Sequence, residues 1–268
     1  MVGHVIVLPD INSEKSFMKI KPLPVNFTLA QFREATPLDE FNVWTFLLDR
    51  NSERVGVKRR DAALENLEKI FVATFRLANT VGFGAMTLRD LCRETGLSMG
   101  GLYGYIQNKD QLADMIDDTV RYVSEILPTW FKDVPVPLDE LECILRAHIY
   151  LSEIFQPWAY FVFLESRALA NAHGLVPKET EIGIQSYISH LIQACAFFTA
   201  EEATLLAAHC MSMVQDWHLK RWKFGSNNIG ADAFANSVVR FVRSYIQMRQ
   251  GEAGLVPGND PVLADVAA

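Results

Sequence analysis

Between Thr87 and Lys109 the chain reads TLRDLCRETGLSMGGLYGYIQNK, a stretch dense in signals that start and stop helices. Thr87 is a favourable N-cap, and Asp90 three residues later completes a capping-box pattern. Gly96 tolerates the left-handed backbone conformation with which helices often end. These signals predict a helix of two turns that stops at a sharp turn.

A second short helix is predicted directly after this turn, because Ser98 is again a favourable N-cap and Leu102 supplies an apolar anchor. Asn108 then caps a third helix, with Gln111 as its capping-box partner. Two short helices joined by a glycine-containing turn make a helix-turn-helix, whose second helix fits the major groove of DNA. The sequence therefore predicts a DNA-binding head.

Four segments in this region keep the order and spacing of a known domain: Val81-Gly82-Phe83, Met86-Thr87-Leu88-Arg89-Asp90-Leu91, Gly96-Leu97-Ser98, and Leu102-Tyr103-Gly104-Tyr105 followed by Lys109. On these segments, Ile70 to Leu112 resembles the DNA-binding domain of the tetracycline-repressor-like (TetR) family of bacterial regulators. The resemblance implies a three-helix head followed by a helical domain that binds an effector and dimerises.

We expect an all-α fold with about nine helices, since no stretch alternates strongly enough between apolar and polar residues to favour a sheet. The expected parts are an N-terminal extension (1–53), a helix-turn-helix domain (54–112), an effector-binding and dimerisation domain (113–250) and a mobile, Gly/Pro-rich tail (251–268).

The N-terminal extension departs from the family pattern, in which the DNA-binding domain usually starts close to the N-terminus. Val5 to Leu8 predicts a short strand, and the apolar cluster around Trp44 predicts a short helix after Pro37. A segment this rich in Phe, Leu, Val and Trp is not typical of a disordered tail. We expect it to fold back onto the helical body or onto a sister subunit; a mobile arm is the alternative.

The formal net charge of −7 argues against a nucleic-acid binder when it is taken globally. The charge is not uniform, however. Residues 53–110 hold nine basic and seven acidic side chains, which gives this segment +2 and leaves −9 for the rest. The asymmetry favours a DNA-facing end at the predicted head.

A basic cluster at Arg54 and Lys58 to Arg60 stands just before the first helix of the head. One interpretation is a solvated helix start, although basic charge there opposes the helix dipole. The other is an arm that touches phosphates or enters the minor groove, which we favour because a helix-turn-helix follows.

Chemistry assigns roles to further side chains of the head. Thr87 lies at a helix N-terminus, which suits a phosphate, and Arg89 can reach a phosphate or a guanine edge. The resemblance implies that Tyr103, Tyr105 and Lys109 clamp phosphates; packing of the two large rings is the alternative for the tyrosines.

The glycines of the predicted recognition helix are unusual. Each costs about 1 kcal/mol relative to alanine, and they remove side chains at positions that often read bases. Met99 then becomes the main side chain for a base contact, with DNA shape supplying further selectivity. The predicted DNA-contacting residues are Arg59, Arg60, Thr87, Arg89, Ser98, Met99, Gly100, Gly101, Tyr103, Tyr105 and Lys109.

Aromatic residues crowd the part of the chain where the resembling family forms its effector pocket. For any single ring, a place in the core is the simpler interpretation. Pockets are, however, mostly apolar with a few polar groups, so the sequence predicts a cavity for a small hydrophobic or aromatic effector. The candidate residues are Trp130, His148, Phe155, Trp158, Phe161, Phe163, Glu165 and Arg167.

The last two long helices, expected at 200–224 and 230–250, carry apolar faces. In the resembling family this pair forms a four-helix bundle with its twin, which implies a homodimer on a pseudo-palindromic operator in double-stranded DNA. The alternative is that these faces close the core of the monomer.

Other function classes find little support. The four cysteines lack CxxC spacing and the six histidines lack an HExxH pair, which disfavours a metal site. We also find no nucleotide loop or catalytic motif, and therefore expect neither a cofactor nor an enzyme. No apolar run reaches the length of a membrane span, and the chain lacks a signal-peptide pattern, so we expect a cytoplasmic protein without membrane contact.

Two hypotheses from different classes remain. The first is a ligand-responsive, dimeric DNA-binding regulator, most simply a repressor that a hydrophobic effector releases from its operator. The second is a helical small-molecule-binding or interaction protein whose helix-turn-helix no longer reads DNA, an interpretation that the glycines keep open.

Overall fold

The structure, a computed structural model, describes residues 19–173, 176–195 and 198–254, and side chains over 19–165, 180–195 and 198–252. Within these residues every regular element is helical, which confirms the all-α prediction. The elements are α2 (Leu29–Ala35), α3 (Val43–Arg50), α4 (Arg60–Val81), α5 (Leu88–Thr95), α6 (Met99–Leu102), α7 (Lys109–Ile126), the 3-10 turn η1 (Leu127–Trp130), α8 (Pro137–Ile154), α9 (Gln156–His173), α10 (Val176–Cys195), α11 (Ala200–Leu219), α12 (Arg221–Gly225) and α13 (Ala231–Gly254).

The expected number of about nine helices is too low for the described residues, because α2, α3 and the short α12 come in addition. The predicted strand at Val5 to Leu8 lies outside the described residues, as does the predicted tail from residue 255 onward. The last helix continues four residues beyond the predicted boundary at 250, to Gly254.

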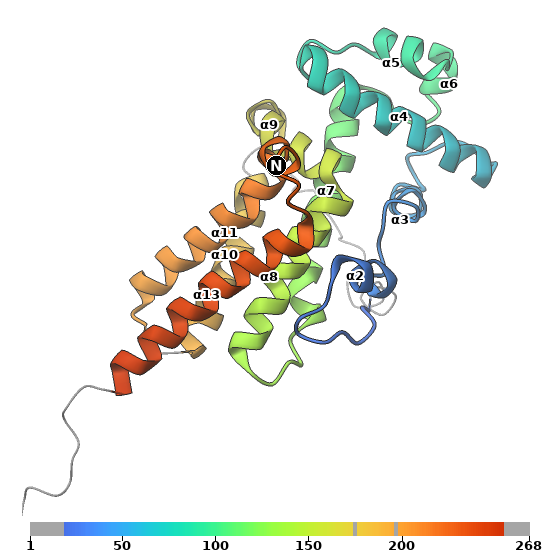
Figure 1. Cartoon of the computed structure of the whole chain (residues 1–268). Coiled ribbons are helices and arrows are strands. Elements are labelled where there is room, and N and C mark those ends of the chain that lie inside the picture. The colour runs from blue at the N-terminus through green and yellow to red at the C-terminus, as the bar shows by residue number, and fades with distance from the viewer. Residues whose placement is uncertain (1–18, 174–175, 196–197, 255–268) are drawn as a thin grey trace, which may run out of the picture.

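The head consists of α4, α5 and α6, which project from the upper right of the molecule in Figure 1. α4 buries an apolar face that includes Leu67, Ile70 and Phe71, and α5 packs across it through the fully buried Leu91. α7 leads from the head into the body, where its Met115 and Ile116 are buried.

The body is built around α8, most of whose side chains are buried because α9, α10, α11 and α13 pack around it. α11 and α13 lie side by side and end the described chain (Figure 1). Thr199 caps α11 through a capping box with Glu202, and Pro137 starts α8 at a position where its missing N–H costs nothing.

Residues 19–57, which we call the N-terminal strap, fold back onto this body. Phe27 and Phe32 are fully buried and stack on each other, while Phe27 also stacks on Phe131 and packs edge-on against Tyr150. The hydroxyl of Tyr150 and the amide of Leu29 both donate to one carboxylate oxygen of Asp232. The expected fold-back is confirmed for residues 19–53, and the mobile-arm alternative is wrong for them.

The second half of the strap fills the space between head and body. Trp44 of α3 packs against Phe71 of the head and Trp158 of the body, with ring centroids 6.0 and 5.8 Å away. Arg50 forms an ion pair with Asp118 of α7 at 2.9 Å and lies over the ring of Tyr122. The strap is therefore part of the same hydrophobic core as the head and the body.

Candidate DNA-binding face and effector cavity

The local signals of the helix-turn-helix produce the predicted geometry. Thr87 and Asp90 form a complete capping box, and Gly96 ends α5 in the left-handed conformation at φ 73°. The Ser98 hydroxyl accepts a hydrogen bond from the Gly101 amide, and Asn108 caps α7. Gln111 accepts from the Gln107 amide instead of completing a box with Asn108.

The surface of α6 that faces away from the core is open. Leu102 is its single buried residue, whereas Ser98, Gly100 and Gly101 are exposed. Tyr103 directly after the helix is 44% exposed, and Met99 is partly exposed. With four residues, α6 spans little more than one turn, so the recognition helix offers DNA mainly backbone, one hydroxyl and two long side chains.

The α5 N-terminus is already satisfied within the chain. The Thr87 hydroxyl donates to the Asp90 carboxylate at 2.7 Å, and this bond and the bond from the Thr87 amide hold the pKa of Asp90 below its usual range. Arg93 lies 2.6 Å from the same carboxylate. Thr87 contacts a phosphate only if its hydroxyl leaves Asp90.

Two residues predicted to clamp phosphates have their polar atoms hydrogen-bonded within the chain. Tyr105 is 3% exposed, and its hydroxyl accepts from Asn66 and donates to the Ala62 carbonyl of α4, so the packing alternative holds for this ring. The Lys109 ammonium donates to three carbonyls of the turn before α5, those of Phe83, Gly84 and Met86. It also lies over the aromatic ring of Phe83. All three of its donors are thus in use.

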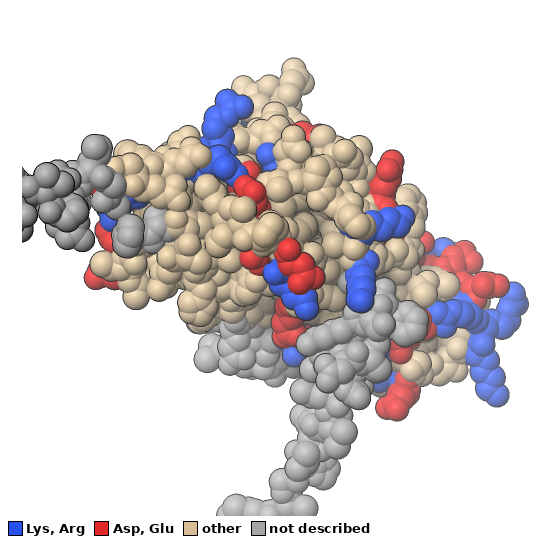
Figure 2. All heavy atoms as spheres, turned by 90° about the horizontal axis from the view of Figure 1, so that it is seen from below, with Lys and Arg blue, Asp and Glu red and all other residues tan. Residues whose placement is uncertain are grey.

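Apart from Lys109, residues 53–110 hold eight cations, which divide into two groups. Four form no ion pair in the described part of the chain, namely Arg54, Lys58, Arg59 and Arg89. Four pair with carboxylates, namely Arg60 with Asp49, Lys69 with Glu65, Arg76 with Glu94 and Arg93 with Asp90. Figure 2 shows Lys and Arg side chains gathered, beside Asp and Glu, at the end of the molecule where α3 and the start of α4 lie.

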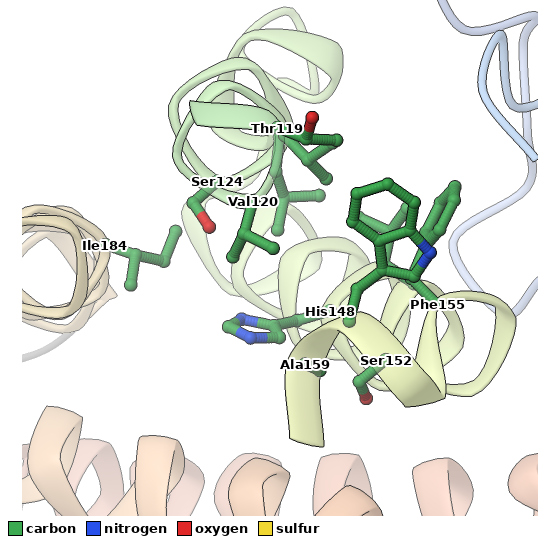
Figure 3. A pocket seen from close by; sticks show the side chains of 12 residues that line it. Thr119, Val120, Ser124, His148, Ser152, Phe155, Ala159 and Ile184 are labelled. Carbon is green, nitrogen blue, oxygen red and sulfur yellow. The ribbon is translucent and has the colours of Figure 1, made fainter. Parts of the chain in front are cut away.

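A cavity of about 70 Å³ lies in the body where α7, α8, α9 and α10 meet (Figure 3). It contains three of the residues predicted from sequence, which are His148, Phe155 and Trp158. The remaining wall residues were not predicted, because the prediction followed aromatic residues and these nine are not aromatic. They are Thr119, Val120, Val123, Ser124, Leu127, Leu151, Ser152, Ala159 and Ile184.

None of the twelve wall residues carries a charge at neutral pH. Burial, together with the nearby His218, lowers the pKa of His148 to about 4, so its imidazole is neutral. Its Nδ1 is buried and has no hydrogen-bond partner among the described residues. Thr119 and Ser152 donate to the carbonyls of their own helices, which leaves Ser124 and His148 as the polar groups open to a ligand.

The other predicted effector residues lie elsewhere. Trp130 packs on Phe32 of the strap, and Phe163 is 45% exposed beside His218. The remaining two described residues connect α9 to the head: Phe161 packs against Phe75 and Phe83, and the Glu165 carboxylate accepts from the Phe83 amide. The side chain of Arg167 lies outside the described residues.

Within the described ranges, no group of three or more His, Cys, Asp or Glu side chains is arranged to hold a metal ion. The helices searched over those ranges are also too short or too polar to cross a membrane.

The head matches a known protein family in sequence, and the head and body together match solved structures in fold. Residues 70–116 match the family model described as bacterial regulatory proteins, tetR family. A search of curated protein sequences gives no match.

Three solved structures share the fold. A tetR-family regulatory protein from Rhodococcus RHA1 has 20% identity and a TM-score of 0.55, over 69% of this chain and 97% of that chain. The ketosteroid transcriptional regulator KstR2 of Mycobacterium tuberculosis has 15% identity and a TM-score of 0.52, over 74% and 97%. The fatty acid degradation regulator FadR from Bacillus halodurans has 15% identity and a TM-score of 0.51, over 66% of this chain and 94% of that chain.

Members of this family are DNA-binding transcriptional regulators and not enzymes. Residues 70–116 therefore match the helix-turn-helix domain of the tetR family of bacterial regulatory proteins, and the helical body shares the fold of solved regulators of that family.

Proposed function

We propose that the chain is a dimeric repressor that a small uncharged effector releases from its operator. The observation that carries this proposal is the position of α9, which touches both the cavity and the head. Its Trp158 lines the cavity, and one to two turns later its Phe161 and Glu165 hold Phe83, the residue at the corner before the helix-turn-helix.

The proposed operator contacts come from the exposed residues of the head. Arg59 and Arg89 supply unpaired charge, while α6 offers Ser98, Met99 and Tyr103. Arg60 and Thr87 contribute only after leaving their carboxylate partners, and Gly100 and Gly101 let the backbone approach a base edge. Tyr105 and Lys109 are not proposed as contacts.

The proposed dimer interface is formed by α11 and α13. Leu205 is 55% exposed on α11, and Phe241, Tyr245 and Met248 form an exposed stripe at helical spacing on α13. Large apolar side chains at i, i+4 and i+7 on a surface helix favour a partner helix. A second copy meeting this face makes a four-helix bundle and puts two heads on one side, as a pseudo-palindromic operator requires.

The proposed effector is small and neutral. A cavity of about 70 Å³ is far below the few hundred Å³ of typical drug-sized sites, so a larger molecule enters only if the walls move. A buried carboxylate or phosphate without a counter-charge costs several kcal/mol, and the walls supply no such charge. The apolar walls and the two open polar groups instead match an apolar molecule with one hydroxyl or carbonyl.

Release follows if the effector binds better to a conformation in which the head is tilted away. A ligand that pushes on Trp158 displaces α9, and α9 carries the Phe83 corner with it. The coupling is reciprocal, so operator DNA must weaken effector binding by the same factor by which the effector weakens DNA binding.

A DNA-binding experiment tests the head. Selection from random duplexes should yield a pseudo-palindromic sequence bound by two chains. Because four cations per head are unpaired, a dimer has about eight, and the slope of log K against log salt should be no steeper than about −7. Arg89→Ala should weaken binding about tenfold and reduce the slope by about 2, since each dimer loses two phosphate contacts.

Lys69→Ala is the matched control, because Lys69 is already paired with Glu65 and should leave both affinity and slope unchanged. If no duplex binds even at low salt, the regulator hypothesis fails and a helical small-molecule-binding protein remains.

A probe pair tests the cavity. Benzyl alcohol and benzoate share a ring and differ in charge, and tryptophan fluorescence can follow both because Trp158 is in the wall. We expect the alcohol to bind at least tenfold more tightly, since benzoate would bury its charge unpaired. Ala159→Leu should fill the cavity and abolish binding, whereas Ala30→Leu on the exposed face of α2 should not. Equal or tighter binding of benzoate would contradict the neutral-effector proposal.

A further inference from the structure

The recognition helix is too short and too rich in glycine to hold its own position. α6 has four residues, two of which are Gly100 and Gly101, and each glycine weakens a helix by about 1 kcal/mol relative to alanine. Its N-terminal end is fixed by the Ser98 cap, and its last residue, Leu102, is buried in the core. The contacts of the segment that follows, residues 103–106, therefore also set its angle.

That segment is bound both by α4, through the Tyr105 hydroxyl, and by the N-terminal strap. The Gly56 amide donates a hydrogen bond of 3.0 Å to the Gly104 carbonyl, which is two residues beyond α6. A side chain at position 104 would have its Cβ 3.3 Å from a methyl group of Val57 and 3.2 Å from the Gly101 carbonyl. Gly104 thus permits a close approach of two backbones, and the strap occupies the space that it leaves.

The strap is in turn fixed to the body. Trp44 packs against both Phe71 and Trp158, and Arg50 is paired with Asp118 of α7. Between these anchors and Gly56, the chain turns through hydrogen bonds to the Asn51 carbonyl and buries Val55. A continuous, packed segment therefore runs from the body to the end of the recognition helix.

We propose that residues 43–57 position the recognition helix: the strap sets the angle of α6 to the body and holds the unpaired Lys58 and Arg59 beside it. In this arrangement the strap is a third connection between the head and the body, beside α7 and α9. Gly56 and Gly104 are positioning residues, which act through the recognition helix and touch no base. The inference rests on the proposed function, because angle and placement matter only if the head reads DNA.

A pair of substitutions at one position tests the hydrogen bond. Gly56→Pro removes the donor, whereas Gly56→Ala keeps it and places its Cβ at an ordinary 4.0 Å from the Gly104 carbonyl. In the full-length chain we expect Gly56→Pro to weaken binding to the selected duplex about tenfold, with the salt slope unchanged, because contacts are misplaced and not removed. Gly56→Ala should bind as the wild type does.

Hydrogen exchange gives a readout without DNA. In Gly56→Pro, the amides of residues 103–106 should exchange at least tenfold faster than in Gly56→Ala, because the end of α6 is no longer held. Unchanged exchange, or faster exchange with unchanged DNA affinity, would overturn the proposal. If the wild type binds no duplex, the proposed function fails, while the exchange comparison still decides whether the strap holds α6.

A second pair covers the case in which Gly56→Pro does not fold. Arg50→Leu detaches the strap from α7, whereas Arg121→Leu removes another partner of the same Asp118 carboxylate and leaves the strap bound. Only Arg50→Leu should weaken DNA binding, by about threefold to tenfold, and speed exchange at residues 103–106. Equal effects of the two substitutions would reject a role of the strap.

Discussion

Lowering the pH from 7 to 5 is expected to remove about 4 kcal/mol from the free energy of unfolding, and two buried histidines account for it. Burial lowers the pKa of both His148 and His218 from the ordinary 6.5 to about 4. The folded state keeps both rings neutral, whereas the unfolded chain binds protons below pH 6.5. The stability is therefore complete above pH 6.5 and is lost as the pH falls toward 4.

The magnitude follows from the linkage relation, since each pH unit between the two pKa values costs about 1.4 kcal/mol per group. From 6.5 to 5, each histidine loses about 2 kcal/mol. Most carboxylates stay ionised over this range, so the histidines dominate the change.

Urea unfolding at pH 7 and pH 5, at one protein concentration, measures this effect. His148→Leu or His218→Leu should each reduce the difference between the two pH values by about 2 kcal/mol. His190→Leu, at an exposed position of α10, should retain the wild-type difference. A wild-type chain equally stable at both pH values would show that the two rings are solvated or hydrogen-bonded in solution.

Phe32→Ala is expected to reduce the free energy of unfolding by about 3–5 kcal/mol, although Phe32 lies in a segment outside the family's usual domain. Its ring is fully buried and packs against Phe27, Trp130 and Tyr150. Alanine would leave a large cavity under α2 and detach the strap from the body.

Phe41→Ala is the matched control, because Phe41 is in the same strap but 81% exposed. This substitution should change the free energy of unfolding by no more than about 0.5 kcal/mol. A loss below about 1 kcal/mol for Phe32→Ala in urea unfolding would mean that the strap unfolds independently of the core.

The parts that the sequence predicts well are those that local chemistry decides. The caps at Thr87, Ser98 and Asn108 and the left-handed Gly96 depend on neighbours within a few residues, and each lies where it was expected. A similar signal at Thr28 and Gln31, which form a capping box, was available for α2 and was missed.

The parts of the fold and of the candidate site that the sequence predicts poorly depend on packing between distant segments. Tyr105 and Lys109 match the family's phosphate-clamp pattern, yet α4 and the Phe83 turn take up their polar atoms. On α9, aromatic content alone does not distinguish Trp158, which lines the cavity, from Phe161, which faces the head. The cavity-lining residues of α7 and α10 could not be picked out from the sequence, because valine, serine and isoleucine are common in any helix.

Under the proposed function, the exposed glycines of α6 have a consequence for how the protein can change its target. A Cβ added at Gly100 would meet no atom within 4 Å, and alanine or a longer residue there would also raise helix propensity. New base-reading side chains can thus be acquired at this position without loss of fold. Divergence toward another operator is open to the protein through a single codon.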